Sequence, residues 1–388
     1  MLDSFLAKPL LSEDMMLSWL EISRSAVCQN YRIFKDMVAP LPVMPIVKSN
    51  AYGHGLEQVM ACLKEEGLDW IGVNYLSEAR LLREQGFLGD ILVVGPYFKE
   101  ELFEASTHKV TLFLSHLEAL ESWIASEWKP KIHIKIDSGM SRQGFLLKEI
   151  PELIQKVKPF ENLVEGIATH FSNVEDVLDH AYADQQMLEF EQAQEMFEKA
   201  GFKKLLAHAA SSASTLILQP SRYDLCRIGI SLYGFWPSAT TKVSFHQIHS
   251  KVAGLRPALS WRTRIAQVKD VAAHRYVGYG LTFKALKDMK LAVIPVGYYE
   301  GYPRIAGSAH SYVLVDGQRC PIVGRICMNM MMIDITHIHG PHVGQLVTLV
   351  GKDGQEEIAA SDIATWSETI HYEFVSRLHP AIPRNIVP

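Results

Sequence analysis

The sequence predicts an α/β fold in which an N-terminal (β/α)8 barrel of the TIM type precedes a C-terminal, mostly-β domain. Through the first 250 residues, eight short apolar runs alternate with amphipathic helical patterns. From about residue 251 the pattern changes to period-two alternation, broken by closely spaced glycines and prolines. A chain of 388 residues also exceeds what one hydrophobic core usually fills. We therefore expect two domains, over residues 1–250 and 251–388.

The eight expected barrel strands are buried apolar runs that end in small or polar residues. They cover residues 43–48, 69–74, 91–95, 110–114, 131–137, 163–170, 205–208 and 223–230. Amphipathic stretches at residues 56–66, 76–85, 116–126 and 179–200 predict helices between these strands. A doubly wound open sheet remains an alternative, because periodicity alone does not decide whether the sheet closes.

The C-terminal domain is expected to be an antiparallel β structure. Alternation over residues 261–268, 311–315 and 345–350 predicts strands, and a helical pattern returns only at residues 358–367. Glycine and proline at short intervals indicate the turns that connect these strands.

Composition narrows the functional class. A net charge of −5 argues against nucleic-acid binding, and no run of eighteen apolar residues suggests a membrane span. The N-terminus lacks the pattern of a signal peptide, so we expect a cytoplasmic protein. The five cysteines are far apart and never form a C-x-x-C pair, which favours reduced thiols. The histidines of residues 337–342 lack acidic or cysteine ligands at metal spacing, so no metal site is expected.

Lys48 ends the first expected strand and opens a loop of small residues, at the strand end where barrel enzymes keep their chemistry. Tyr52 and the neighbouring glycines offer a hydroxyl and a close backbone approach to an anionic ligand. A surface lysine beside a flexible turn is the alternative interpretation of this segment alone.

Two further cations follow on the strand of residues 131–137. Lys135 alternates with isoleucines, so its ammonium is expected to point into the barrel, where a charge is costly unless it is paired or neutralised. Arg142 lies in the glycine-bearing loop after this strand, where it suits two parallel hydrogen bonds to a carboxylate.

The last strand ends suggest a phosphate site. Ser212 begins an expected helix, whose free backbone N–H groups favour phosphate, and Gly229 permits close approach to the same anion. A helix-capping serine and a turn in the core are the alternatives for each residue taken singly. A lysine, an arginine and phosphate-type loops at successive strand ends together predict pyridoxal phosphate, held by a lysine as a Schiff base.

Seven motifs make the chain resemble the alanine racemases, the fold-type-III family of pyridoxal-phosphate enzymes with a barrel and a β domain. They are VKSNAYGHG (47–55), KIDSGMSRQG (135–144), THF (169–171), RIG followed by YG (227–229 and 233–234), GYG (278–280), GY (297–298) and GRICM (324–328). Their order is collinear from about residue 17 to about residue 384, so the resemblance covers nearly the whole chain.

The resemblance implies a homodimer that interconverts L-alanine and D-alanine with two bases and pyridoxal 5'-phosphate, supplying D-alanine for peptidoglycan. Lys48 would bind the cofactor and act as one base, and Tyr279 would be the other, in the partner subunit's site. Further implied cofactor contacts are Tyr52, His170, His208, Ser212, Arg227, Gly229, Ile230 and Tyr372. The substrate carboxylate would meet Arg142 and the backbone of Met328, Lys135 would be a carbamylation site, and the access corridor would include Glu175, Tyr298, Arg304 and Arg325.

The sequence departs from the family pattern at three positions. Asn329 stands where aspartate is usual, Ser49 where alanine is common, and Ser211 where asparagine is usual. Asn329 changes the charge near the access corridor, which leaves strict alanine preference open. The alternatives are a racemase of another amino acid such as serine, a decarboxylase, or a non-catalytic pyridoxal-phosphate protein, which would lack the β domain.

Overall fold

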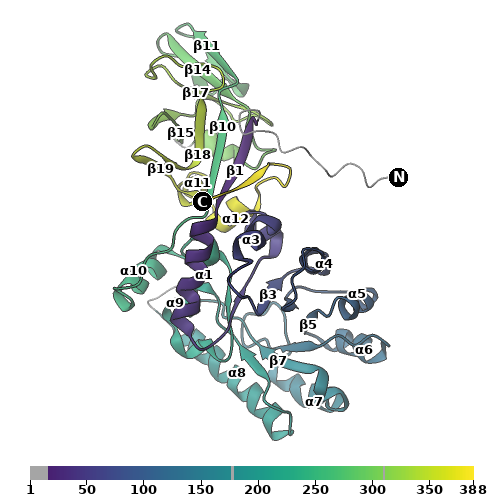
Figure 1. Cartoon of the computed structure of the whole chain (residues 1–388). Helices are drawn as coiled ribbons and strands as arrows, with labels where there is room; N and C mark the ends of the chain where they lie inside the picture. The colour runs from purple at the N-terminus through teal and green to yellow at the C-terminus, as the bar shows by residue number, and fades with distance from the viewer. Residues whose placement is uncertain (1–15, 176–178, 309–310) are drawn as a thin grey trace, which may run out of the picture. The chain divides into compact units, whose positions relative to one another are not determined.

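The computed structural model describes residues 16–175, 179–308 and 311–388, and the chain divides into two compact units (Figure 1). The barrel unit comprises residues 24–51 and 59–257. The β unit comprises residues 52–58 and 258–388 together with residues 16–23. Strand β1 (Ser18–Ser23) therefore belongs to the β unit, where it pairs with β10 (Leu259–Arg264) and β20 (Arg384–Val387).

Eight parallel strands form the ring of the barrel unit. They are β2 (Val43–Pro45), β3 (Trp70–Val73), β4 (Asp90–Val93), β5 (Thr111–Leu114), β6 (Ile132–Lys135), β7 (Val164–Ala168), β8 (Leu206–His208) and β9 (Cys226–Ile228). Strands β3 to β8 form one sheet and β2 pairs with β9. A bridge between Ile46 and Gly72 joins β2 to β3, and the Arg227 N–H donates to the Ala210 carbonyl beyond β8. These links close the ring, which confirms the predicted fold class.

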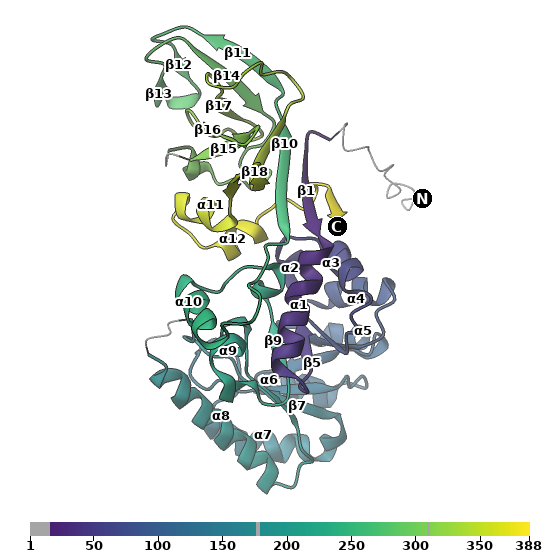
Figure 2. The same ribbon diagram turned by 60° about the vertical axis from the view of Figure 1, so that its left-hand side comes forward.

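Helices surround this ring, as Figure 2 shows for α4 to α8. The helices that carry barrel-unit residues are α1 (Arg24–Val38), α3 (Leu56–Leu63), α4 (Leu76–Glu84), α5 (Leu102–Thr107), α6 (Leu117–Ala125), α7 (Ile150–Val157), α8 (Ala181–Lys199), α9 (Ser212–Ile217) and α10 (Ala239–Ile248). Helix α1 buries Val27, Tyr31, Phe34 and Val38, which recur at the spacing of one helical face. Within the described ranges, every helix is too short or too polar to cross a bilayer.

The β unit contains a seven-stranded sheet and two smaller ones. The large sheet has the order β16-β15-β18-β10-β1-β20, with β19 beside β18, and the others are β11-β14-β17 and β12-β13. The remaining elements are β11 (Gln267–Val271), β12 (Tyr276–Val277), β13 (Phe283–Lys284), β14 (Met289–Ile294), β15 (Tyr312–Val315), β16 (Gln318–Pro321), β17 (Met331–Asp334), β18 (Leu346–Asp353), β19 (Glu356–Ile358), α11 (Ala360–Trp366) and α12 (His371–Ser376).

The alternating segment 261–268 was expected to form one strand, but it is shared between two sheets. The N–H of Ile265 donates to Gln345, beside β18, whereas the N–H of Ala266 donates to Val293 in β14. Consecutive residues thus change partners, and β10 gives way to β11. Alternation of apolar and polar residues indicates that one face of a strand is buried. It does not indicate with which neighbouring strand each backbone N–H or carbonyl group forms its hydrogen bond.

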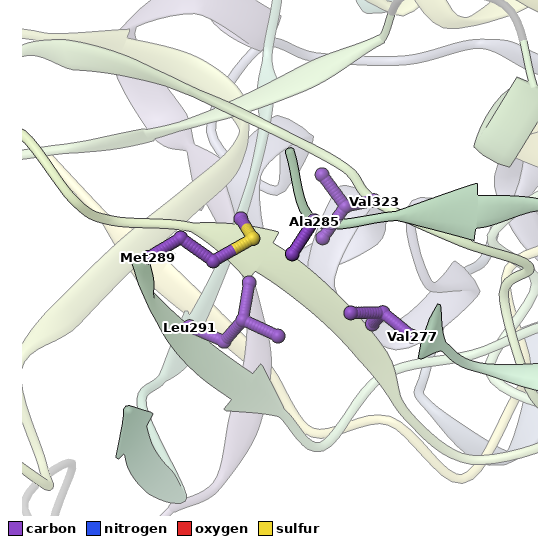
Figure 3. Close-up of a cluster of buried hydrophobic side chains, with 5 residues drawn as sticks. All are labelled: Val277, Ala285, Met289, Leu291 and Val323. Atoms are coloured by element: carbon purple, nitrogen blue, oxygen red, sulfur yellow. The ribbon is translucent and has the colours of Figure 1, made fainter. Parts of the chain in front are cut away.

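A small apolar core supports the hairpin that contains Tyr279 (Figure 3). Its buried members are Val277, Ala285, Met289, Leu291 and Val323. Gly278, at the start of the hairpin loop, has φ +75°, and a Cβ there would lie 3.0 Å from the Met332 side chain. The core therefore holds both ends of a tight loop whose tip is exposed.

Leu291→Ala tests the dependence of the β unit on this core. Leu291 is only 4% exposed, so its truncation is expected to lower the free energy of unfolding by ~2–4 kcal/mol. The matched control is Leu88→Ala, because Leu88 is 94% exposed and its truncation should change stability by less than ~0.5 kcal/mol. Urea unfolding followed by circular dichroism measures both, and equal effects would contradict the assigned core.

Candidate active site

The segment after β2 forms a left-handed turn that begins at Lys48. Ser49, Asn50, Ala51 and Tyr52 have φ values of 57°, 54°, 53° and 52°. This conformation costs roughly 1–2 kcal/mol per residue for side chains with a Cβ. Neighbouring groups must hold such a turn, and the position of the Lys48 backbone depends on them.

Glu78, in the first turn of α4, is the side chain that holds it. One carboxylate oxygen accepts from the N–H groups of Ser49, at 2.5 Å, and Asn50, at 3.4 Å. The other accepts from the N–H groups of Asn74, at 2.8 Å, and Tyr75, at 3.2 Å. One carboxylate therefore joins the end of β3 to the turn after β2. Sequence analysis missed this role, since a glutamate three residues after a helix N-cap predicts only a local cap.

The amine of Lys48 is half-buried among cations. Burial, followed by the charge of Arg142, lowers the pKa of Lys48, and the carboxylate of Glu78 opposes this shift. The charge of Arg227 lowers the pKa further. The amine consequently loses its proton at a lower pH than free lysine and becomes a better nucleophile.

Arg227 is buried in the ring with its terminal nitrogens fully engaged. Nη1 donates to His208, at Nδ1 (2.6 Å) and at the carbonyl oxygen (2.9 Å). Nη2 donates to the carbonyls of Thr169 and Ala209, both at 2.8 Å, and to Nδ1 of His170 at 3.2 Å. Burial lowers the pKa of Arg227 to about 10, so it remains a cation at neutral pH. Of the five N–H groups, only Nε–H has no hydrogen-bond acceptor among the described residues, which leaves it for a ligand.

Lys135 and His170 lie in the same electropositive region. Burial, then the charges of Arg227 and Arg142, lowers the pKa of Lys135 well below that of free lysine. Its Nζ donates to the Ile136 carbonyl at 3.0 Å. Burial, then the charge of Arg227, also holds the pKa of His170 far below its ordinary value. Both groups are therefore held toward their neutral forms.

The backbone after β9 and the start of α9 meet at Ser212. Its Oγ accepts from the N–H groups of Gly229, at 3.0 Å, and Ser231, at 3.4 Å. Ile230 opens the 3-10 turn η6 (Ile230–Tyr233) between them. All four residues are buried, and a small anion such as a phosphate would bind here by replacing the Ser212 hydroxyl as the acceptor of these backbone amides.

Arg142 lies in a loop that folds back onto the strand it follows. Oδ1 of Asp137 accepts from the N–H groups of Gly139, at 3.0 Å, and Ser141, at 2.9 Å. The N–H of Phe145 then donates a hydrogen bond to the Lys135 carbonyl oxygen at 2.8 Å. The loop is thus fixed at both ends, with the guanidinium exposed. Glu175, another predicted residue, is exposed on a different loop.

The remaining predicted residues belong to the β unit, and most of them are exposed. They are Tyr52, Tyr279, Tyr298, Arg304, Arg325, Met328 and Tyr372. A Cβ on Gly280 would lie 2.8 Å from Nη1 of Arg325, so the Tyr279 loop contacts this arginine. Arg304 and Arg325 line one cavity of about 440 Å3.

Within the β unit, Tyr52 and Tyr372 place their ring centroids 6.5 Å apart. Burial raises the pKa of Tyr52 to about 12, so its hydroxyl keeps its proton and donates.

Glu300 is a second carboxylate that sequence analysis missed. Its two oxygens accept from Nδ2 of Asn329, at 2.7 Å, and from the N–H of Gly297, at 2.8 Å. The N–H of Tyr299 also donates to the Met328 carbonyl at 2.8 Å. The loops that contain Tyr298 and Met328 are therefore joined.

Comparisons with known proteins agree over both units. The family model of the alanine racemase N-terminal domain matches residues 22–237, and that of the C-terminal domain matches residues 258–386. The alanine racemase of Leptospira interrogans is 39% identical over 97% of each chain. The alanine racemase of Methanococcus maripaludis is 37% identical over 94% of this chain and 97% of its own.

Solved structures show the same similarity. Alanine racemase from Streptomyces lavendulae matches with a TM-score of 0.87 and 30% identity, over 96% of this chain and 97% of that one. Alanine racemase from Bacillus anthracis, solved with bound L-Ala-P, has a TM-score of 0.87 and 30% identity, over 98% and 96% of the two chains.

Glu78→Ala is expected to release the left-handed turn. Loss of the carboxylate that joins the two segments should cost ~2 kcal/mol of stability. Lys48 should also react as a neutral amine at lower pH, because the negative charge of Glu78, which raises the pKa of Lys48, is removed. Urea unfolding measures stability, and reductive methylation across pH with peptide mass spectrometry measures the amine. The control is Glu84→Ala on the exposed face of α4, with little expected effect. A labelling profile unchanged by Glu78→Ala would contradict the assigned role.

Lys135→Met is expected to stabilise the protein by ~1 kcal/mol or more at neutral pH, because it removes a buried amine with one hydrogen bond. At pH values between the lowered pKa of Lys135 in the folded protein and the ordinary value of 10.5, the unfolded chain binds a proton at this amine that the folded protein does not bind. Wild-type stability therefore rises with pH across this window, and the advantage of the variant shrinks. Urea midpoints from pH 6 to 10 in carbonate-free buffer measure this trend. An advantage that grows with pH would contradict it.

Proposed function

The chain belongs to the alanine racemase family, and on that premise we propose that it interconverts L-alanine and D-alanine with pyridoxal 5'-phosphate as a homodimer. The observation that carries the proposal is the placement of Lys48 just after β2 while Arg227 lies on the neighbouring parallel strand β9, in register with Met44. One offers an amine whose pKa is lowered by burial, and the other offers a single remaining N–H donor.

The donor set of the barrel unit fits this cofactor. Lys48 would hold its aldehyde carbon, Nε of Arg227 would donate to its ring nitrogen, and the backbone around Ser212, Gly229 and Ile230 would bind its phosphate. Tyr52, Tyr372, His170 and His208 complete the proposed cofactor site. When bound, the cofactor delocalises the charge left on the substrate Cα after proton removal, which no protein side chain can do.

Two bases on opposite faces are needed to invert the Cα. We assign proton removal from L-alanine to Tyr279 and proton removal from D-alanine to Lys48, each returning a proton in the opposite direction. Tyr279 is 70% exposed on its hairpin, which suits a base that acts in the partner subunit's site.

Exposed apolar side chains of the β unit support a subunit interface. They are Tyr276, Tyr279, Leu281, Leu286, Met328 and Met330, each at least 47% exposed. A two-fold dimer that places Tyr279 in the partner's site would cover such side chains and give each active site one base from each subunit.

Arg227 limits side reactions in this proposal. A guanidinium donates a hydrogen bond and keeps its proton, so the ring nitrogen it faces stays unprotonated. Removal of the proton from the substrate Cα is then harder, but the return of a proton to that Cα is favoured over transamination.

The other predicted residues serve the substrate. Arg142 and the backbone of Met328 would bind the carboxylate, and Glu175, Tyr298, Arg304 and Arg325 would line the access corridor. Lys135 is held toward its neutral form, which is the form that reacts with carbon dioxide to give a carbamate. Serine racemisation is the second candidate, because a pocket discriminates one small group by only ~1–3 kcal/mol.

The product would be D-alanine for peptidoglycan, made in the cytoplasm. This role follows from the proposed reaction and from the D-amino acids that peptidoglycan contains.

Hydrogen exchange in D2O tests the two-base assignment. Cofactor-loaded wild type should lose the Cα–H signal of L-alanine in proton NMR and yield D-alanine by chiral analysis. Tyr279→Phe should lower exchange from L-alanine by a factor of ~100 or more, while Lys48 still exchanges D-alanine without racemising it. Equal loss with both enantiomers would contradict the assignment, and exchange of serine but not alanine would favour the second candidate.

Mixed dimers test the shared site. Lys48→Ala and Tyr279→Phe subunits are each inactive in racemisation, but a mixed dimer would contain one site with both bases. Random mixing should restore about a quarter of wild-type activity. No restoration, with mixed dimers shown by mass spectrometry, would place both bases in one subunit.

A further inference from the structure

A line of buried polar side chains continues from Arg227 through the barrel, away from the proposed cofactor. Nδ1 of His208 lies 2.6 Å from Nη1 of Arg227, and its Nε2 lies 2.8 Å from Nδ1 of His133. Nε2 of His133 lies 3.5 Å from Oε2 of Glu165, which is an electrostatic contact too long for an ordinary hydrogen bond, and this nitrogen has no hydrogen-bond partner among the described residues. These four residues come from the adjacent strands β9, β8, β6 and β7, and both histidine side chains are fully buried.

The direction of these hydrogen bonds follows from the chemistry of Arg227. A guanidinium only donates, so Nδ1 of His208 must accept. His208 then carries its single proton on Nε2 and donates to Nδ1 of His133, whose own proton must lie on Nε2, facing Glu165. The reverse direction between the rings would leave His208 without a proton on either nitrogen.

Burial supports neutral rings in this line. It is the main cause that lowers the pKa of His133, and it lowers that of His208 well below the ordinary value, with the charge of Arg227 adding to the shift. Glu165 is ionised: burial opposes its charge, but its interactions with His133 and Lys131 outweigh burial and lower its pKa to about 2.

Glu165 also has partners outside the line. Its oxygens accept from Nζ of Lys131 and from Oγ1 of Thr111, the latter at 3.2 Å. Arg227 makes no ion pair with any carboxylate in the described part of the chain, and Glu165 is the anion at the far end of this line of contacts.

The packing leaves the rings little freedom. His208 stacks on Phe113 with an interplanar angle of 16°, and His133 lies against Trp70, with centroids 5.5 Å apart. A Cβ on Gly166 would lie 2.7 Å from the His133 ring, so the absence of a side chain there makes room for it.

We infer that Glu165 is a positioning residue that acts on Arg227 through His133 and His208. Its carboxylate faces Nε2 of His133 at 3.5 Å and so favours a proton on that nitrogen, which is the tautomer that Arg227 requires of both imidazoles. Only that tautomer presents a lone pair to Nη1 of Arg227, whereas the other would set two N–H groups 2.6 Å apart. The relay therefore fixes the guanidinium in the orientation that leaves Nε–H available. The role of Nε–H toward a cofactor rests on the proposed function, but the relay itself does not.

Histidine NMR of the cofactor-loaded protein without substrate tests the relay. With 15N-labelled histidine, both rings should be neutral with the proton on Nε2, and His133→Gln and His208→Asn assign the signals. Glu165→Leu should weaken this preference in His133, because Arg227 alone then supports it, and should broaden or shift the His208 signal. Lys131→Met is the matched control, since it removes the exposed partner of Glu165 and should leave both tautomers unchanged.

Glu165→Gln keeps an acceptor oxygen and serves if Glu165→Leu does not fold. In Glu165→Gln, His133 should keep its proton on Nε2, but its 15N signal should shift. An imidazolium, or a proton on Nδ1 of His208, in wild type would overturn the relay. Histidine signals that stay unchanged in both Glu165 variants would overturn the role of Glu165.

Kinetics then separate the relay from the reaction. Loss of the relay should lower kcat about tenfold with little change in KM, because Arg227 is disturbed and the substrate carboxylate site is not. An unchanged kcat in a variant with altered tautomers would overturn the positioning role. If wild type fails to racemise alanine but shows the expected tautomers, the proposed function fails and the relay stands.

Discussion

The buried cation of Arg227 is the constraint around which the barrel unit is arranged. A guanidinium without an adjacent carboxylate is stable in a barrel only if many acceptors surround it. Here the ends of β7 and β8 supply three carbonyls, and two imidazoles supply the remaining lone pairs. The need for acceptors is met by backbone carbonyls that the fold places at one end of the ring. The residues at the polar ends of these strands therefore cannot be substituted independently of one another.

The same constraint explains the electrostatics of the site. Burial, then the charges of Arg142 and Arg227, lowers the pKa of Lys48 and of Lys135, and the lysines respond because, unlike arginine, an amine readily gives up its proton. A chain with a net charge of −5 thus concentrates positive charge where an anionic cofactor and a carboxylate substrate would bind. Lys48, the lysine proposed to react, is thus held toward its neutral form by burial and by the cations proposed to hold its ligands.

Sequence patterns predicted the barrel because each strand and helix has its own local periodicity. The sequence contains no comparable signal for the pairing of strands that are far apart in the chain. β1, for example, joins the β unit through contacts with residues 259–263 and 384–387. The cations at strand ends were also predictable, since a charged residue after a buried run is conspicuous. Glu78 and Glu165 were not, because a carboxylate in a helix cap or a strand looks ordinary until its distant partners are known.

The departure at Asn329 also depends on such a partner. An aspartate at this position would place a second carboxylate against Glu300, whose oxygen lies 2.7 Å from Nδ2 of Asn329. With asparagine, the contact becomes a hydrogen bond, and Glu300 joins the Asn329 loop to Gly297. The substitution therefore removes a charge and adds a link between the loops of Tyr298 and Met328. Its effect on substrate choice would act through the position of these loops as well as through charge, since two like charges so close would drive them apart.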